Sequence, residues 1–170
     1  RYGDAILTHL PMKLKKAGLL PKKRHQTSLE PRGAIWVEII VNGIPVQVIN
    51  THLDIRAGSR EAQIDTLLSE QWLRHAECRG PTIFCGDFNA RPMSTVYQKT
   101  VQQLSDTHSP ALGNQPQDTF FTRFPSTRID YIFADRDIEI IGSHVPNNEM
   151  TRISSDHFPV ISDIRLSSDR

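Results

Sequence analysis

Residues 82–89 read TIFCGDFN. The first four are apolar enough for a strand inside a sheet core, and the next four bring a glycine, a carboxylate and an amide to the end of that strand. Asp87 and Asn89 are two positions apart, so their side chains are expected on the same side of the chain. Such a pair can bind a hard cation or orient a water molecule. An isolated Asp-Phe-Asn is more often a turn that satisfies its own backbone, and both alternatives stay open on these residues alone.

Further strands are expected on both sides of this segment. They cover residues 34–41, 46–52, 128–134, 138–141 and 158–166. Asn42-Gly43, between the first two, is the strongest short signal for a hairpin. Residues 59–78 have apolar side chains at helical spacing, which predicts one long helix capped by Ser59, and a second helix is expected after Ser94. Strands outnumber helices and neighbouring strands are expected to be antiparallel, which indicates an α+β fold.

Length and composition indicate an ordinary globular domain. The chain has 170 residues, 38% of them hydrophobic, and a net charge of +1. A single domain of this size buries roughly 70% of its unfolded surface, so stability requires neither disulfides nor a structural metal. The near-neutral charge argues against binding nucleic acid through bulk electrostatics. Cys78 and Cys85 lack the CxxC spacing of a zinc or redox site, so we expect reduced thiols in a reducing compartment, the cytoplasm.

Residues 12–31 are expected to form a surface loop. Its first charged residues are all basic: Lys13, Lys15, Lys16, Lys22, Lys23 and Arg24. The segment from Lys13 to Arg24 can contact phosphates or an anionic membrane surface, and a solvated loop explains it about equally well. No obligate protein partner is indicated.

Four short polar clusters follow or interrupt apolar strands. They are residues 50–52 (NTH), 86–89 (GDFN), 128–131 (RIDY) and 154–157 (SSDH). Asp130 lies in an otherwise apolar strand, where an unpaired carboxylate costs on the order of several kcal/mol, so it requires a partner. Histidine is the natural partner because a carboxylate on one ring nitrogen raises the basicity of the other. His157 and His52 are the candidates, although each alone is also explained as a hydrogen-bonded structural residue.

Together with residues 2–7 (YGDAIL), these clusters resemble, in order, the motifs of the endonuclease/exonuclease/phosphatase superfamily. Deoxyribonuclease I, exonuclease III-type abasic endonucleases, neutral sphingomyelinases and inositol polyphosphate 5-phosphatases share this fold. The resemblance spans the whole chain. It implies a two-sheet, mostly antiparallel β-sandwich with flanking helices, and a metal-dependent hydrolase of the phosphodiesterase or nuclease type.

The resemblance also implies roles for the cluster residues. His157 is expected to be the base that activates the attacking water, with Asp130 as its orienting partner. Asp87 and Asn89 are expected to line the phosphate and nucleophile position. His52 is expected to donate a hydrogen bond to a phosphate oxygen or a proton to the leaving group.

Asp156 and Asp87 are expected on the metal side of the site, with Mg²⁺ or Mn²⁺ as the cofactor. In this family an Asn and a Glu upstream of the Tyr-Gly strand chiefly hold the metal, and the chain begins at that strand. The resemblance therefore implies one domain over residues 1–170, the C-terminal two-thirds of the family domain, lacking its N-terminal strands. Such a fragment is expected to bind Mg²⁺ weakly, to show near-background activity and to expose a strand edge near residues 34–41 or 2–8.

The expected substrate is a phosphodiester in a nucleic acid, a phospholipid or a small phosphoester. Residues 118–124 stand where abasic endonucleases carry a Trp-containing stretch, which lowers the case for DNA repair. Phe120, Phe121 and Phe124 can stack on a base or a sugar, although packing is the more frequent role of three close aromatics. The alternative function is a catalytically incomplete family member that acts as a binding module.

Overall fold

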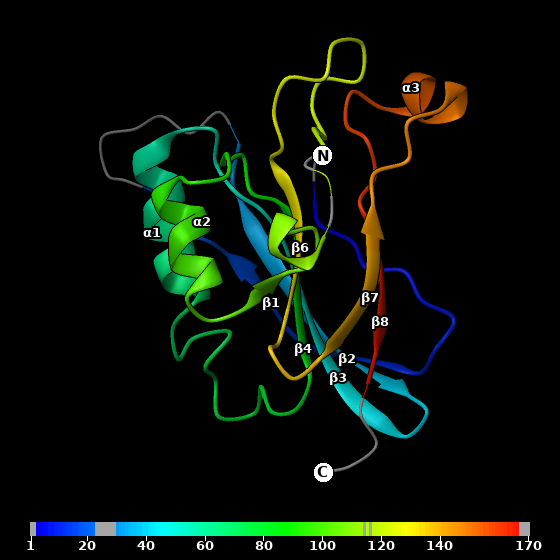
Figure 1. The fold of residues 1–170 in the computed structure, drawn as a ribbon. Helices are drawn as coiled ribbons and strands as arrows, with labels where there is room; N and C mark the ends of the chain where they lie inside the picture. Colours follow the sequence, from blue (N-terminus) through cyan, green and yellow to red (C-terminus); the bar gives the residue numbers. More distant parts are fainter. Residues whose placement is uncertain (1–2, 23–29, 114, 116, 167–170) are drawn as a thin grey trace. The chain divides into compact units, whose positions relative to one another are not determined.

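The structure is a computed structural model that describes residues 3–22, 30–113, 115 and 117–166 (Figure 1). The chain divides into two compact units, Arg1–Asn89 and Ala90–Arg170. Both combine mostly antiparallel strands with short helices, as an α+β fold requires. Of the helices in the described ranges, none has the length and apolar character that spanning a bilayer demands.

In the first unit, the described residues form four neighbouring strands in the order β1-β2-β3-β4. They are Met12–Leu19 (β1), Gly33–Val41 (β2), Ile44–His52 (β3) and Thr82–Asp87 (β4). The hairpin between β2 and β3 is confirmed, since Asn42 and Gly43 both have the positive φ angles, 50° and 83°, of a tight turn. β3 and β4 are parallel, contrary to the expectation of antiparallel neighbours, and His52 lies opposite Asp87 in their register.

The prediction of a loop over residues 12–31 is wrong for its first part, because residues 12–19 form β1. Among the described strands it pairs with β2 alone, and lysines are typical of such an edge. The ammonium of Lys15 lies 2.9 Å from Glu77, and that of Lys16 lies 4.5 Å from the ring centroid of Trp72. An exposed edge at residues 34–41 is also wrong, since β2 has a partner on each side.

These contacts bear on the prediction that the segment from Lys13 to Arg24 binds phosphates or an anionic membrane surface. Two of its lysines interact within the first unit. Lys23 and Arg24 lie outside the described residues. The binding of phosphates or an anionic membrane surface by this segment therefore stays a prediction.

The long helix predicted for residues 59–78 is much shorter in the structure. α1 covers Ala57–Leu67, and Ser59 lies buried inside it instead of capping it. The hydroxyl of Ser69 donates to the Thr66 carbonyl at 2.7 Å and accepts from the Gln71 amide at 3.1 Å, so it replaces the bonds that would continue the helix. Trp72 is nevertheless buried, which explains why its spacing resembled a helical position.

The described residues of the second unit form two antiparallel strand pairs and three short helical segments. In chain order they are α2 (Thr95–Val101), β5 (Ser105–Asp106), the 3₁₀ helix η1 (Pro110–Leu112), β6 (Asp130–Ala134), β7 (Glu139–His144), α3 (Glu149–Ser154) and β8 (Ile161–Arg165). β5 pairs with β6, and β7 pairs with β8. The predicted helix start is confirmed, because the Ser94 hydroxyl accepts from the amide of Tyr97.

A buried ion pair explains the arginine of the RIDY cluster. The side chain of Arg128, 8% exposed, contacts the carboxylate of Asp106 and donates to the carbonyl of His108 at 3.0 Å. Its guanidinium also lies 4.6 Å from the ring centroid of Tyr131. Arg128 therefore has a structural role, because breaking a buried pair of this kind leaves an uncompensated charge.

The imidazole of His108 beside this pair predicts a loss of stability in acid. His108 is buried, and burial together with the Arg128 charge lowers its pKa, an effect that Asp106 partly offsets. Between the lowered pKa of the folded state and the unfolded value of about 6.5, the unfolded state therefore binds more protons than the folded state, so stability falls as the pH drops through that range. The free energy of unfolding in urea should therefore be lower at about pH 5.5 than at about pH 7.5, and this difference should be smaller in His108→Gln than in the parent. The matched control is His144→Gln, whose side chain is exposed. An unchanged difference in His108→Gln would contradict the assignment.

Candidate functional site

The parallel ends of β3 and β4 bring His52 and Asp87 together in the first unit. Nε2 of His52 lies 3.1 Å from Oδ2 of Asp87. The imidazole is 41% exposed, whereas the carboxylate is 15% exposed. The amide of Leu53 donates to the Asp87 carbonyl at 2.9 Å, which continues the pairing past the strand ends. The sequence indicated that both residues are functional, but it did not indicate this pair.

The two interpretations of the GDFN cluster, a self-satisfied turn and a pair of functional side chains, are compatible with each other. Oδ1 of Asp87 accepts from the amide of Asn89 at 2.8 Å, so the cluster does form a self-satisfied turn. Asn89 adopts a left-handed φ of 48°, and its side-chain nitrogen donates to the Leu53 carbonyl at 2.9 Å. The turn holds the second carboxylate oxygen of Asp87 against His52.

Gly86 allows β3 and β4 to approach closely at this point. Its φ is 135°, and a Cβ built on it would lie 1.9 Å from the Thr51 carbonyl oxygen. Real Cβ atoms essentially never approach a neighbour so closely. Only glycine therefore fits between Cys85 and Asp87 without displacing the backbone.

Asp4 lies in the same cleft as His52, and the sequence did not point to it. Arg32 also lines this cleft. Burial raises the pKa of the Asp4 carboxyl, and the charges of His52 and Arg32 oppose that shift. The available signal was the aspartate of YGDA, at the position where the family strand has an asparagine.

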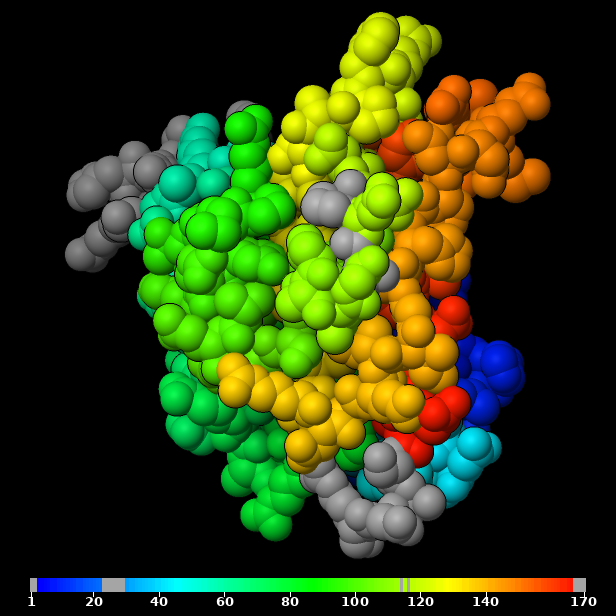
Figure 2. Space-filling view, in the orientation of Figure 1, coloured from blue at the N-terminus to red at the C-terminus, as the bar shows by residue number. Residues whose placement is uncertain are grey.

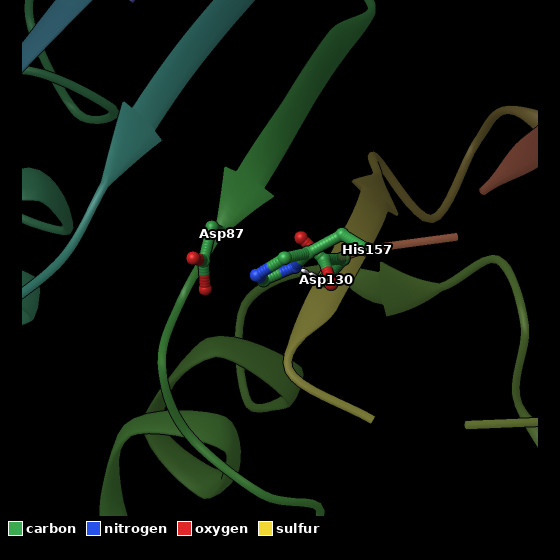
Figure 3. Close-up of side chains that lie close together, drawn as sticks. All are labelled: Asp87, Asp130 and His157. Carbon is green, nitrogen blue, oxygen red and sulfur yellow. Dashed lines mark hydrogen bonds and ion pairs between the residues drawn. The ribbon is translucent and has the colours of Figure 1, made fainter. Parts of the chain in front are cut away.

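In the second unit, Asp130 and His157 form the hydrogen bond expected for a general base. Oδ2 of Asp130 lies 2.8 Å from Nδ1 of His157 (Figure 3). The pair is partly buried, with side chains 18% and 27% exposed. The prediction that these residues pair is confirmed, and Asp130 does not pair with Arg128, whose partner is Asp106. A carboxylate that accepts from Nδ1–H leaves Nε2 as the basic nitrogen.

Thr119 supports both members of this pair, and the sequence did not point to it. Its hydroxyl oxygen accepts from the amides of Ile129 and Asp130 at 3.1 and 3.2 Å. Its carbonyl accepts from the amide of Phe158 at 2.7 Å, directly after His157. Thr119 is completely buried, so it holds the backbone on both sides of the acid–base pair.

The aromatic segment beside His157 divides into a packed and an exposed part. The ring of Phe120 lies 4.8 Å from the His157 ring, which is a packing role. Phe121 and Phe124 are exposed, on a segment that lies next to the residues following α3 (Figure 2). Thr122 joins the two segments through bonds to the carbonyls of residues 155 and 156.

The proposed metal ligands differ in their surroundings. The side chain of Asp156 is exposed in the turn before His157. Asp87, Asp130 and His157 each offer a ligand atom on a half-buried side chain. Carboxylate oxygens suit Mg²⁺ and Mn²⁺, so Asp87, Asp130 and Asp156 fit the expected cofactor chemically. The roles implied by the family resemblance require six side chains to converge in one site, and this stays a prediction for His52, Asp87, Asn89, Asp130, Asp156 and His157.

Comparison with known proteins identifies relatives over nearly the whole chain. The model of the Endonuclease/Exonuclease/phosphatase family matches residues 1–157. YbhP of Escherichia coli (strain K12) is 25% identical over 167 residues, which is 97% of this chain and 63% of YbhP. The chain thus spans less than two-thirds of the length of the curated relatives it matches.

Solved structures share the fold. A conserved protein of unknown function from Enterococcus faecalis V583 matches with a TM-score of 0.72 and 24% identity, over 92% of this chain and 68% of that chain. A mannosyl-6-phosphatase from Bacteroides thetaiotaomicron VPI-5482 matches with a TM-score of 0.70 and 19% identity, over 91% and 67% of the two chains. This likeness confirms the predicted deoxyribonuclease I-like fold class. Because the family model covers residues 1–157, the chain belongs to the endonuclease/exonuclease/phosphatase family.

Proposed function

We propose that the protein is a metal-dependent phosphodiesterase in which His157 activates the attacking water. Members of its family are hydrolases that act on phosphoester bonds. The observation that carries the proposal is the 2.8 Å hydrogen bond between Asp130 and His157. A carboxylate so placed orients the ring and stabilises the imidazolium that forms when Nε2 takes a proton.

In the proposed reaction, the water oxygen forms a bond to phosphorus as the bond from phosphorus to the leaving oxygen breaks. His157 takes the water proton. His52, held against Asp87 at 3.1 Å, donates a hydrogen bond to a phosphoryl oxygen or a proton to the leaving oxygen. Asn89 lines the phosphate position. When bound by Asp87 and Asp156, Mg²⁺ or Mn²⁺ would neutralise charge on the phosphoryl oxygens.

The proposed substrates are phosphodiesters of a nucleic acid, a phospholipid or a small phosphoester. Phosphomonoester hydrolysis is the second candidate, because one structural neighbour is named a mannosyl-6-phosphatase. Bis-p-nitrophenyl phosphate and p-nitrophenyl phosphate distinguish the two, since they differ in the second ester bond. We expect the diester to be hydrolysed faster.

Metal dependence is tested by the rate of bis-p-nitrophenyl phosphate hydrolysis as a function of Mg²⁺ concentration in the full-length protein. Chelation should abolish turnover. Asp87→Asn removes a charged ligand, so the Mg²⁺ concentration for half-maximal rate should rise about 10-fold or more. Asp163→Asn is the matched control, because its exposed carboxylate lies on β8. Unchanged turnover after chelation, or equal Mg²⁺ requirements in the two variants, would contradict the proposal.

A further inference from the structure

The cleft beside His52 has the size and lining of a small-molecule site. It has a volume of about 420 Å³, within the usual range for ligand pockets, and all of its lining residues belong to the first unit. Asp4, Glu30, Arg32 and His52 supply its charged and titratable groups. Gly3 leaves its wall open, since a Cβ built there meets nothing within 4 Å.

The charges in the cleft restrict the chemistry of its ligand. The Arg32 guanidinium lies 3.5 Å from the Glu30 carboxylate, and its side chain is only 12% exposed. This fixed positive charge opposes a metal cation between the carboxylates, and the two carboxylates oppose a simple anion. Carboxylates accept hydrogen bonds only, whereas Arg32 donates them only. A matching ligand therefore presents both hydroxyl donors and an anionic acceptor.

His52 connects the cleft with the proposed reaction. It lines the cleft, and its Nε2 contacts Asp87 at the end of β4. A phosphoester whose phosphate lies at His52 can therefore place one of its alcohol groups in the cleft. This step rests on the proposed function, because it takes His52 as a phosphate-binding residue.

We propose that the cleft binds the hydroxyl-rich alcohol part of a phosphoester, such as a sugar or another polyol, with Asp4 and Glu30 accepting from its hydroxyls. Arg32 and His52 then face the phosphate end. The surroundings of Asp4 agree with this role. Burial raises its pKa despite the nearby charges of His52 and Arg32, and hydroxyl donors would stabilise the carboxylate.

The test is calorimetric binding of glucose 6-phosphate and methyl phosphate to the full-length protein. Charge-assisted hydrogen bonds to the sugar should make glucose 6-phosphate bind about 10-fold tighter or more. Asp4→Asn should reduce the ratio of the two affinities to nearly one, while methyl phosphate still binds. Gly3→Leu should do the same without removing a charge, because it enlarges a residue that lines the cleft.

Three results would overturn the inference. The first is an equal affinity of the parent for glucose 6-phosphate and methyl phosphate. The second is a ratio of these affinities that is unchanged by both substitutions. The third is phosphoethanolamine binding as tightly as glucose 6-phosphate, which would indicate an ammonium site. Hydrolysis of bis-p-nitrophenyl phosphate, which has no hydroxyl groups, is measured on the same preparations. It tests the proposed function alone, so the two proposals can fail independently.

Discussion

His157→Ala is expected to lower kcat for bis-p-nitrophenyl phosphate about 10²- to 10⁴-fold, the usual contribution of a positioned general base. The substitution removes the nitrogen that takes the water proton and leaves Asp130 without its partner at 2.8 Å. Steady-state kinetics with Mg²⁺ on the full-length protein measure the loss. KM should change much less than kcat, because the base acts on the water and not on the bound ester.

Two further variants separate this role from a structural one. His144→Ala removes an exposed imidazole at the end of β7 and should leave kcat unchanged. Asp130→Asn keeps the His157 ring but removes the charge that orients it, so its kcat should lie between those of the parent and His157→Ala. A His157→Ala enzyme that is folded and as active as His144→Ala would show that the base is another group.

Gly86→Ala is expected to cause the largest loss of stability. The added Cβ would lie 1.9 Å from the Thr51 carbonyl oxygen, and backbone atoms cannot move aside by a side-chain rotation. Overpacking and the unfavourable φ of 135° together should cost about 3 kcal/mol or more, which corresponds to a Tm roughly 6–12 °C lower. Thermal unfolding followed by circular dichroism measures the shift.

Gly43→Ala is the matched control for the backbone angle. Gly43 has a φ of 83°, but a Cβ built there has no neighbour within 4 Å. Its Tm should fall by clearly less than that of Gly86→Ala, because it carries the strain without the clash. Equal shifts in the two variants would mean that the close approach of β3 and β4 does not depend on Gly86.

The hairpin of β2 and β3 could be predicted because its signals are local. Asn42-Gly43 and the flanking apolar residues determine the turn and the register together. The parallel pairing of β3 with β4 could not be predicted, since an apolar run such as residues 82–85 suits either direction. That pairing is what places His52 beside Asp87.

The same distinction applies to the site residues. The pair of Asp130 and His157 could be predicted, because a carboxylate in an apolar strand requires a partner and the cluster motifs resembled those of a known family. The support from Thr119 and the place of Asp4 in the cleft depend on segments distant in sequence. No local pattern reports such contacts. The early end of α1 likewise depends on the hydrogen bonds of Ser69.

The origin of the oxygen atom transferred during turnover tests the central claim most directly. Bis-p-nitrophenyl phosphate is hydrolysed by the full-length protein with Mg²⁺ in ¹⁸O-labelled water, and both products are analysed by mass spectrometry. Attack on phosphorus by a water molecule that His157 activates predicts one ¹⁸O atom in p-nitrophenyl phosphate, none in p-nitrophenol, and little product of either kind from His157→Ala. Label in p-nitrophenol, or labelled p-nitrophenyl phosphate formed at the parent rate by His157→Ala, would contradict the account.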